Sequence, residues 1–446
     1  MQLVKKYFFI LAFGLVSLWL YRWFFNIERE SFYELLGVYS LLFIGFVGVF
    51  FKLKKDFSEF TFWGLVGFGI LFRLITIDVS PNLSQDFYRF IWDGRLLLNG
   101  VNPYLYTPNE IIDVLLQTQP DFSVLYSGMG ALSQQHYSNY PPLNQLIFSI
   151  AAFLGGGELR YEIIALRGIL ILADIATLLL SIAVLKRLKL PKTNSLLYFI
   201  NPFIIIELSG NLHFEGLMAC FIVGFVLLFL NKRIKAAALS LSAGVLTKLL
   251  PLLLLPFLIR KLRWSAYIGF CLFVGILCGL GFGFFYSTEL AENYSQTIGL
   301  WFNNFEFNAS VYYLFRTIGY WITGYNTIAI TGKLSAAIGL LAMIYLAFRK
   351  QNKVDQNWII FMLLGLSVYF LFSTTVHPWY LTSLLALSIF TPLRYVLVWT
   401  YLIFISYFTY AQPNDTESMV LITVQYLVVL VVAVYELRTL NLFSKA

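Results

Sequence analysis

The sequence predicts an all-α polytopic membrane protein, and three observations support that fold class. First, the chain of 446 residues is 59% hydrophobic and only 12% charged, about half the charged fraction of soluble domains. Second, the apolar residues fall into repeated runs of about 17–25, the length that crosses a bilayer as a helix. Third, the lysines and arginines lie in short clusters between these runs, which is typical of membrane topology and argues against a nucleic-acid partner.

The first three apolar runs, Tyr7–Phe25, Leu35–Phe51 and Phe60–Ile77, set the orientation of the chain. Lysines precede the first run and follow the second, so the positive-inside rule places those ends in the cytoplasm. The third run then delivers the polar segment 78–142 to the extracytoplasmic side. We expect a multi-pass integral protein of the bacterial inner (plasma) membrane, with both termini in the cytoplasm.

The rest of the chain continues this pattern. A proline-led helix beginning near Tyr140 is too short to cross, and 311–323 is expected to lie on the membrane surface. In total about twelve crossings are expected, together with these two immersed helices and one broken hairpin at 236–259. We see one membrane domain over 1–446. The further expected helices are 159–185, 194–206, 214–230, 264–286, 328–348, 358–372, 379–390, 395–410 and 419–435.

The stretch from Ser84 to Pro108 opens the longest polar segment and carries two acids, Asp86 and Asp93. Seven residues are two helical turns, so the acids share a face if this piece is helical. Asp86 is a candidate general base; the competing interpretation is an acid paired with Arg89. Asp93 precedes a glycine, which favours a turn or a helix cap.

Lys248 interrupts an apolar run at the sequence TKLLP. A lysine at membrane depth is costly and usually faces a cavity or a partner. We therefore expect two half-helices that carry Lys248 inward, where it neutralises a phosphate or forms a structural pair. Asp174, in the middle of another span, is expected to be structural, with Lys248 or Arg167 as its partner.

A second group of polar residues falls in loops assigned to the same side of the membrane. The three histidines all belong to these loops, and a one-sided site rich in acids, imidazoles and amides fits an enzyme better than a pore. Cysteines lie only in apolar runs, without a pattern for a disulfide or zinc. The other candidates in these loops are His213, Glu215, Asn211, Asn308, Arg316, His377 and Tyr380.

The pattern DxxRxxWDG begins at Asp86, and NPY begins at Asn102. YPPL at Tyr140, NP at Asn201 and K-x-x-P at Lys248 follow in order. This order of motifs resembles that of polyprenyl-phosphate-sugar-dependent mannosyltransferases of the GT-C superfold. This middle part also resembles the first mannosyltransferase of GPI-anchor assembly, although that enzyme has one span before the loop and we count three here. FEFNAS and HPWY resemble elements of bacterial membrane mannosyltransferases.

The resemblance implies a GT-C glycosyltransferase fold, a polyprenyl-phosphate sugar donor, a glycan or lipid-linked acceptor, and an inverting single displacement. It places the base at Asp86, with Asp93 as the second acid of the loop. Cations for the departing phosphate are then sought among Lys248, Arg89, Arg95, His377 and Arg316. Substrate contacts are sought among His213, Glu215, Asn211, Asn308 and Tyr380. No close DxD pair is present, so no tightly bound metal is expected and a divalent cation is left open.

Two alternatives remain at this level. A transporter or lipid flippase would use a broken helix such as the one at Lys248 to bind an ion or substrate. Against it, the polar residues gather in one-sided loops and no inverted repeat is visible. A polysaccharide polymerase or ligase would use similar cations with a lipid-diphosphate donor.

Overall fold

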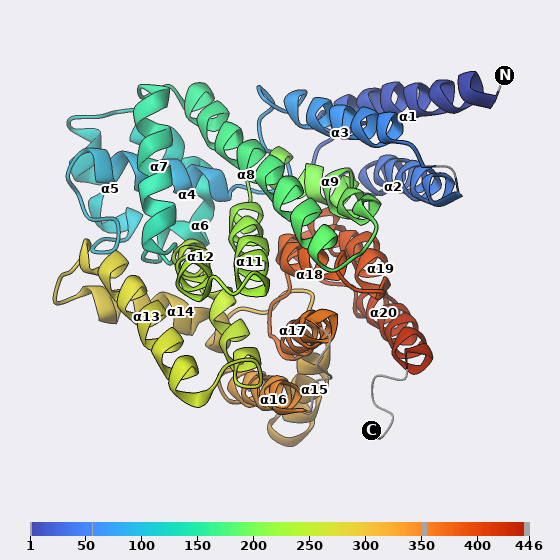
Figure 1. The fold of residues 1–446 in the computed structure, drawn as a ribbon. Coiled ribbons are helices and arrows are strands. Elements are labelled where there is room, and N and C mark those ends of the chain that lie inside the picture. The colour runs from blue at the N-terminus through green and yellow to red at the C-terminus, as the bar shows by residue number, and fades with distance from the viewer. Residues whose placement is uncertain (1, 56, 350–354, 441–446) are drawn as a thin grey trace.

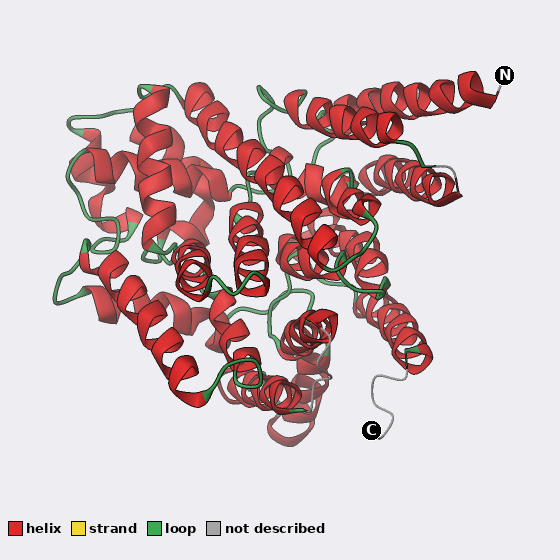
Figure 2. Cartoon of the chain, in the orientation of Figure 1, coloured by secondary structure: helices red, strands yellow, loops and turns green. Residues whose placement is uncertain are grey.

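The computed structural model describes residues 2–55, 57–349 and 355–440 as an assembly of helices (Figure 1). Over these ranges no strand is present, and the remainder is loop and turn (Figure 2). One isolated parallel bridge joins Phe307 to Thr375. The all-α prediction is therefore confirmed.

The first three helices, α1 (Gln2–Phe24), α2 (Phe32–Lys55) and α3 (Glu59–Leu74), follow the three predicted runs within a few residues. They lie together at the N-terminal side of the molecule (Figure 1). Helix α3 starts at an N-cap, where the Ser58 hydroxyl accepts from the Thr61 amide. Near the end of α3, Arg73 contacts the middle of the chain, where it donates to the Phe199 carbonyl.

The segment 78–142 is folded into helices that lie at one end of the molecule (Figure 1). Helix α7 begins at Pro142, where a proline is tolerated because the first-turn amides lack helical partners. Helix α8 follows the predicted span and runs diagonally across the structure. These elements are α4 (Asp86–Leu98), α5 (Pro108–Leu116), α6 (Phe122–Gln134), α7 (Pro142–Gly155) and α8 (Leu159–Arg187).

The middle of the chain is broken twice. The helix expected at 194–206 is a series of short turns, and its last part meets α11 at a bend of 117°. The second break falls at Lys248, whose extended backbone separates a helix from a 3-10 segment, as the sequence predicts. The elements are η1 (Lys192–Ser195), α9 (Leu196–Phe199), α10 (Pro202–Ile204), η2 (Ile205–Gly210), α11 (Glu215–Leu230), α12 (Ile234–Thr247) and η3 (Leu250–Leu258).

The last part of the chain packs beside α11 and α12. Two predicted spans, 379–390 and 395–410, prove to be short helices joined to 3-10 turns. The elements are α13 (Trp264–Gly283), α14 (Leu290–Asn303), α15 (Val311–Thr323), α16 (Ile328–Phe348), α17 (Asp355–Phe372), η4 (Pro378–Tyr380), α18 (Leu381–Ser388), α19 (Tyr395–Leu402), η5 (Ile403–Ala411), η6 (Pro413–Asp415) and α20 (Met419–Thr439).

Seven helices in the described ranges are long and apolar enough to cross a membrane, or eight if the bent pair 202–210 and 215–230 forms one span. The apolar helices α7 and α12 and the segment 395–411 are shorter. Many large apolar side chains on α1, α13, α16 and α20 are exposed, as expected for helices that face lipid. The protein is thus an all-α polytopic membrane protein.

Buried ion pairs fix the helices that flank the loop region. Arg73 Nε lies 2.9 Å from Asp174 Oδ2, and both side chains are fully buried. Lys248 and Arg167 were expected as partners of Asp174, and that expectation was wrong. The structural role expected for Asp174 is confirmed. Arg167 instead donates to the backbone carbonyl oxygens of Ile77 and Ser209, which holds the start of the 78–142 segment against the bent element.

Candidate functional site

Helix α4 presents Asp86 at its first residue. The chain leading to it is anchored because the Leu83 amide donates to Asn211 Oδ1 over 3.0 Å. Among the described residues, the Asp86 carboxylate has no hydrogen-bond or ion-pair partner, and the side chain is partly exposed. Asp86 is thus held in place by its backbone while its carboxylate remains available.

Burial raises the pKa of Asp86 from 3.8 to about 6. The positive charge of Lys248 opposes this rise, and the negative charge of Glu215 adds to it. Its position at a helix N-terminus also favours the ionised form, so burial is the dominant effect. A carboxylate with this pKa is mostly ionised at neutral pH and is a stronger base than an ordinary aspartate.

Lys248 lies at the break between α12 and η3, as the sequence predicts. Its Nζ is 3.1 Å from Glu215 Oε1 and 5.2 Å from the centre of the Tyr140 ring. The Asn144 amide of α7 donates to the Thr247 carbonyl over 2.8 Å, which fixes the backbone immediately before Lys248. A quarter of the Lys248 side chain remains exposed, so its ammonium is accessible as well as paired.

A set of stacked aromatic and imidazole rings belongs to the same site as Asp86 and Lys248. His213 stacks on Trp379 with ring centres 3.7 Å apart, and His377 stacks 4.5 Å from Trp379 on an almost parallel plane. Tyr380 meets His377 edge-on at 5.4 Å. Burial and the charge of Lys248 lower the pKa of His377 to about 3, so its imidazole is neutral at physiological pH.

The loops that carry FEFNAS and HPWY are paired in the structure, although about 70 residues separate them in sequence. The Phe307 amide donates to Thr374 O, and the Val376 amide donates to Phe307 O over 2.9 Å. The Phe307 ring stacks on His377 with centres 4.8 Å apart. Two motifs noted separately in the sequence therefore build one wall of the site.

We refer to these residues together as the Asp86–Lys248 cluster. They come from α4, the bend before α11, the break after α12 and the turn before α18. The cluster consists of Asp86, His213, Glu215, Lys248, His377, Trp379 and Tyr380. Of the predicted site residues, the structure brings Asp86, Lys248, His377, His213, Glu215 and Tyr380 together.

Asp93 lies in a separate, fully buried network. It accepts from Arg89 Nε at 2.7 Å, from Gln145 Nε2 at 3.0 Å and from the Ser138 hydroxyl. A carboxylate surrounded by three donors and inaccessible to solvent holds α4 to α7 and to the 138–145 segment. Asp93 therefore has a structural role inside α4. The turn or helix cap expected from the following glycine was wrong, because both residues lie within the helix.

The structure gives Arg89 and Arg95 partners other than a donor phosphate. Arg89 pairs with Asp93 and also donates to the carbonyl oxygens of Ser133 and His136. Arg95 binds Glu162 through two nitrogens and donates to the Gly157 carbonyl. Both side chains are buried and paired within the protein, whereas the expectation from the sequence was that they bind the donor phosphate.

Three further predicted residues lie beside the cluster and hold its backbone. Asn211 is fully buried and fixes Leu83 and Ile206. Asn308 is also fully buried and adopts a left-handed backbone, with φ of 46°. Arg316 pairs with Glu306 at 2.5 Å and lies over the Tyr313 ring. The Asn308 side chain donates through Nδ2 to the Val376 carbonyl, while its Oδ1 has no hydrogen-bond partner within the described residues. The substrate and phosphate contacts expected from the sequence stay predictions for these three residues.

Sequence reasoning missed two features next to the cluster. The first is Trp379, whose ring stacks on both His213 and His377. The second is Arg29, from the loop between α1 and α2, whose guanidinium lies 4.1 Å above the Tyr410 ring. Both pairings are between segments far apart in sequence, so only the folded chain reveals them.

Buried polar atoms in and beside the cluster lack a hydrogen-bond partner within the described part of the chain; among them are His213 Nε2, Glu207 Oε2, Glu215 Oε2 and Asn308 Oδ1. Buried polar groups are normally paired, so these atoms indicate where water or a substrate group binds. No three or more histidine, cysteine or acidic side chains in the described ranges are placed to hold a metal ion.

The fold is that of an all-α polytopic membrane protein, and the Asp86–Lys248 cluster lies among its helix ends and loops. A model of a protein family, the N-terminal domain of alpha-(1->6)-mannopyranosyltransferases, matches residues 75–263. That range contains Asp86, His213, Glu215 and Lys248, and it supports membrane mannosyl transfer by this chain. No curated protein and no solved structure gives a significant match.

Proposed function

We propose that the protein is a membrane mannosyltransferase that moves mannose from a polyprenyl-phosphate donor to a glycan or lipid-linked acceptor. The transfer takes place on the extracytoplasmic face and inverts the configuration at the anomeric carbon. The observation that carries this proposal is the unpartnered Asp86 carboxylate, with a pKa raised to about 6, on which the accessible ammonium of Lys248 acts electrostatically. The family match over residues 75–263 is the reason for proposing mannose as the transferred sugar.

In the proposed reaction, the acceptor hydroxyl oxygen attacks the anomeric carbon of the mannosyl group. Asp86 accepts the hydroxyl proton as the new carbon–oxygen bond forms. The bond between the anomeric carbon and the phosphate oxygen breaks, and the lipid phosphate leaves with both electrons. Because a phosphate is a stable leaving group, the reaction requires no acid to protonate it. An α-mannoside formed by inversion requires a β-linked donor.

The remaining cluster residues have distinct proposed roles. Lys248 neutralises the charge that develops on the departing phosphate, which is the largest electrostatic change in the reaction. His377, being neutral, contributes hydrogen bonds but no charge. Glu215 orients Lys248 through the 3.1 Å contact, and His213 and Tyr380 supply polar contacts to the sugar. Arg89 and Arg95 hold α4 in position.

The extracytoplasmic location follows from the charge distribution and from donor chemistry. In the expected topology, Lys52, Lys54, Lys55 and the basic residues 186–192 lie at or just after span ends on the side opposite the cluster. Nucleotide sugars are confined to the cytoplasm, so a lipid-linked sugar is the practical donor outside. We place the protein in the bacterial inner membrane with both termini in the cytoplasm.

The test is incubation of the purified full-length protein in lipid nanodiscs with polyprenyl-phosphate mannose and an α-mannoside acceptor. We expect polyprenyl phosphate and an α-(1→6)-linked product in equal amounts. Use of a lipid-diphosphate donor in place of the monophosphate would favour the polymerase or ligase alternative. Movement of the mannolipid across a vesicle membrane without turnover would favour a flippase and contradict the proposal.

A further inference from the structure

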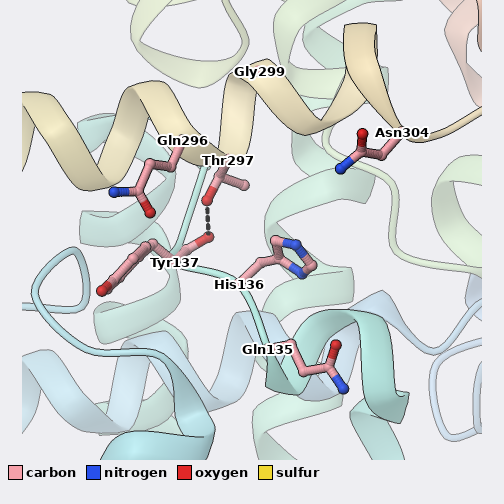
Figure 3. Close-up of a pocket in the computed structure, with 7 residues that line it drawn as sticks. All are labelled: Gln135, His136, Tyr137, Gln296, Thr297, Gly299 and Asn304. Atoms are coloured by element: carbon pink, nitrogen blue, oxygen red, sulfur yellow. Dashed lines mark hydrogen bonds between the residues drawn. The ribbon is translucent and has the colours of Figure 1, made fainter. Parts of the chain in front are cut away.

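A partly open pocket of about 290 Å³ lies between the segment after α6 and helix α14 (Figure 3). Its volume is near the lower end of the range for small-molecule sites, about 300–1,000 Å³. Helix α14 forms one wall, and the segment that follows α6 forms the other (Figure 3). The lining residues are Gln135, His136, Tyr137, Gln296, Thr297, Gly299 and Asn304.

The two walls are joined by hydrogen bonds, so the pocket is a built feature of the fold. Thr297 Oγ1 donates to the Tyr137 carbonyl over 3.1 Å (Figure 3). One turn earlier on α14, the Tyr294 hydroxyl donates to the Asn139 carbonyl over 3.1 Å, and Asn293 Nδ2 donates to the Tyr104 carbonyl over 3.0 Å. Helix α14 is therefore fixed along the 78–142 segment by three side chains.

The chemistry of the lining residues selects the ligand. None of them is acidic, lysine or arginine, so nothing in the lining balances the charge of a phosphate. The lining is equally unsuited to a hydrocarbon tail, because three carboxamides, a hydroxyl, an imidazole and a phenol supply most of its side chains. Carboxamides both donate and accept hydrogen bonds, which matches the vicinal hydroxyls of an uncharged sugar.

His136 adds a hydrogen-bond acceptor, its Nε2 atom, to the pocket. Its Nδ1 lies 2.7 Å from the Leu132 carbonyl, which can only accept, so Nδ1 carries the proton in the neutral ring. Nε2 is then an acceptor, and it has no hydrogen-bond partner within the described ranges. A sugar hydroxyl is a suitable donor to it.

Both walls lead directly to the Asp86–Lys248 cluster. The His136 carbonyl accepts from Arg89 Nη1 over 2.9 Å, and Arg89 is one turn along α4 from Asp86. On the other wall, Asn304 precedes Phe305, whose ring centre is 5.9 Å from that of His377. A glycan whose penultimate unit occupies the pocket would direct its end toward the cluster.

We propose that this pocket binds a neutral hexose unit of the acceptor glycan, next to the unit that receives mannose; this rests on the proposed function. The donor sugar is held by the cluster, and the pocket selects a saccharide acceptor. Gln296 and Asn304 are the specificity-determining side chains, since both are exposed and neither has another hydrogen-bond partner in the described structure.

The test uses full-length protein in nanodiscs with Gln296→Ala and Asn304→Ala, singly and together. Gln117→Ala is the matched control. Gln117 is an exposed carboxamide in the 78–142 segment, which forms one wall of the pocket, but it does not line the pocket. Thr297 is left intact because it joins the walls. Binding of methyl α-D-mannopyranoside and of α-(1→6)-mannobiose is measured by saturation-transfer NMR without donor, and melting temperatures confirm that the variants fold.

Each single variant is expected to weaken mannobiose binding about fivefold, the value of one neutral hydrogen bond, and to raise the acceptor KM by the same factor. The donor KM and the Gln117→Ala control stay at the wild-type values. Wild-type mannobiose affinity in the double variant would overturn the inference while leaving the proposed function intact. Absence of donor turnover in the wild type would overturn the proposed function, and the NMR comparison would still decide whether the pocket binds a saccharide.

Discussion

Lys248 Nζ lies 3.1 Å from Glu215 Oε1 in a protein where both residues also act electrostatically on Asp86. The lysine stands at a helix break and the glutamate at the first turn of α11, so two elements must meet for the pair to form. The arrangement brings one accessible cation into electrostatic reach of one available carboxylate. This is the minimum that displacement of a phosphate by a hydroxyl requires.

Replacing Lys248 tests its role toward the donor. Lys248→Met should raise the donor KM by about tenfold to a hundredfold, because a charge-assisted hydrogen bond to phosphate is lost. Since Glu215 is nearly buried and would lose its cation, the double variant Lys248→Met with Glu215→Gln separates the two effects. If the double variant uses the donor as well as the wild type does, Lys248 is only a structural partner.

The pH dependence of kcat/KM should follow the ionisation of Asp86. The reaction needs the carboxylate, so the rate should fall as the pH drops through about 6. Glu215 raises the Asp86 pKa, so Glu215→Gln should move this acidic limb to lower pH. Lys248 lowers that pKa, so Lys248→Met should move the limb to higher pH. Limbs that do not move, or that move in the opposite directions, would contradict the assignment of Asp86.

The pH dependence of the protein's stability should also report the ionisation of Asp86. The folded-state pKa of Asp86, about 6, lies above its ordinary value of 3.8, so the folded state binds this proton more tightly than the unfolded chain. The contribution of Asp86 to stability is therefore present below pH 4 and declines as the pH rises through about 6. At pH 7.5, Asp86→Asn should melt at or above the wild-type temperature, as measured by a thermal-shift assay; a marked decrease would indicate a structural acid.

The topology is tested by labelling introduced cysteines with a membrane-impermeant maleimide. Ser123→Cys on α6 should react from outside intact cells, and Asn231→Cys after α11 should react only after permeabilisation. Both positions are exposed, whereas Ser84 is buried and unsuitable. Reversed accessibility would overturn the extracytoplasmic placement of the Asp86–Lys248 cluster.

The sequence predicted the helices well where a long apolar run forces one, as in 328–348, which matches α16 to the residue. It also predicted the break at Lys248, because a lysine followed by a proline is costly inside an apolar helix. It predicted poorly where the backbone bends for tertiary reasons. The helix expected at 194–206 is a series of short turns, and its π-helical end is stabilised by Arg167, which lies on another helix.

Side-chain partners were less predictable than helices. Asp86 and Asp93 look alike in sequence, but Arg89, Ser138 and Gln145 donate to Asp93 and none of them donates to Asp86. Asp174 was given the wrong partners because Arg73 is 101 residues away in the chain. The pocket beside α14 could not be inferred, since it depends on the hydrogen bond from Thr297 to the Tyr137 carbonyl.

The rate of polyprenyl-phosphate release by Asp86→Asn tests the central claim most directly. The matched control is Asp113→Asn, an exposed acid on α5 of the same segment. Loss of a general base is expected to lower kcat by about a hundredfold to ten-thousandfold, with the donor KM unchanged and Asp113→Asn at the wild-type rate. An Asp86→Asn protein that folds and releases polyprenyl phosphate as fast as the wild type would contradict the mechanism.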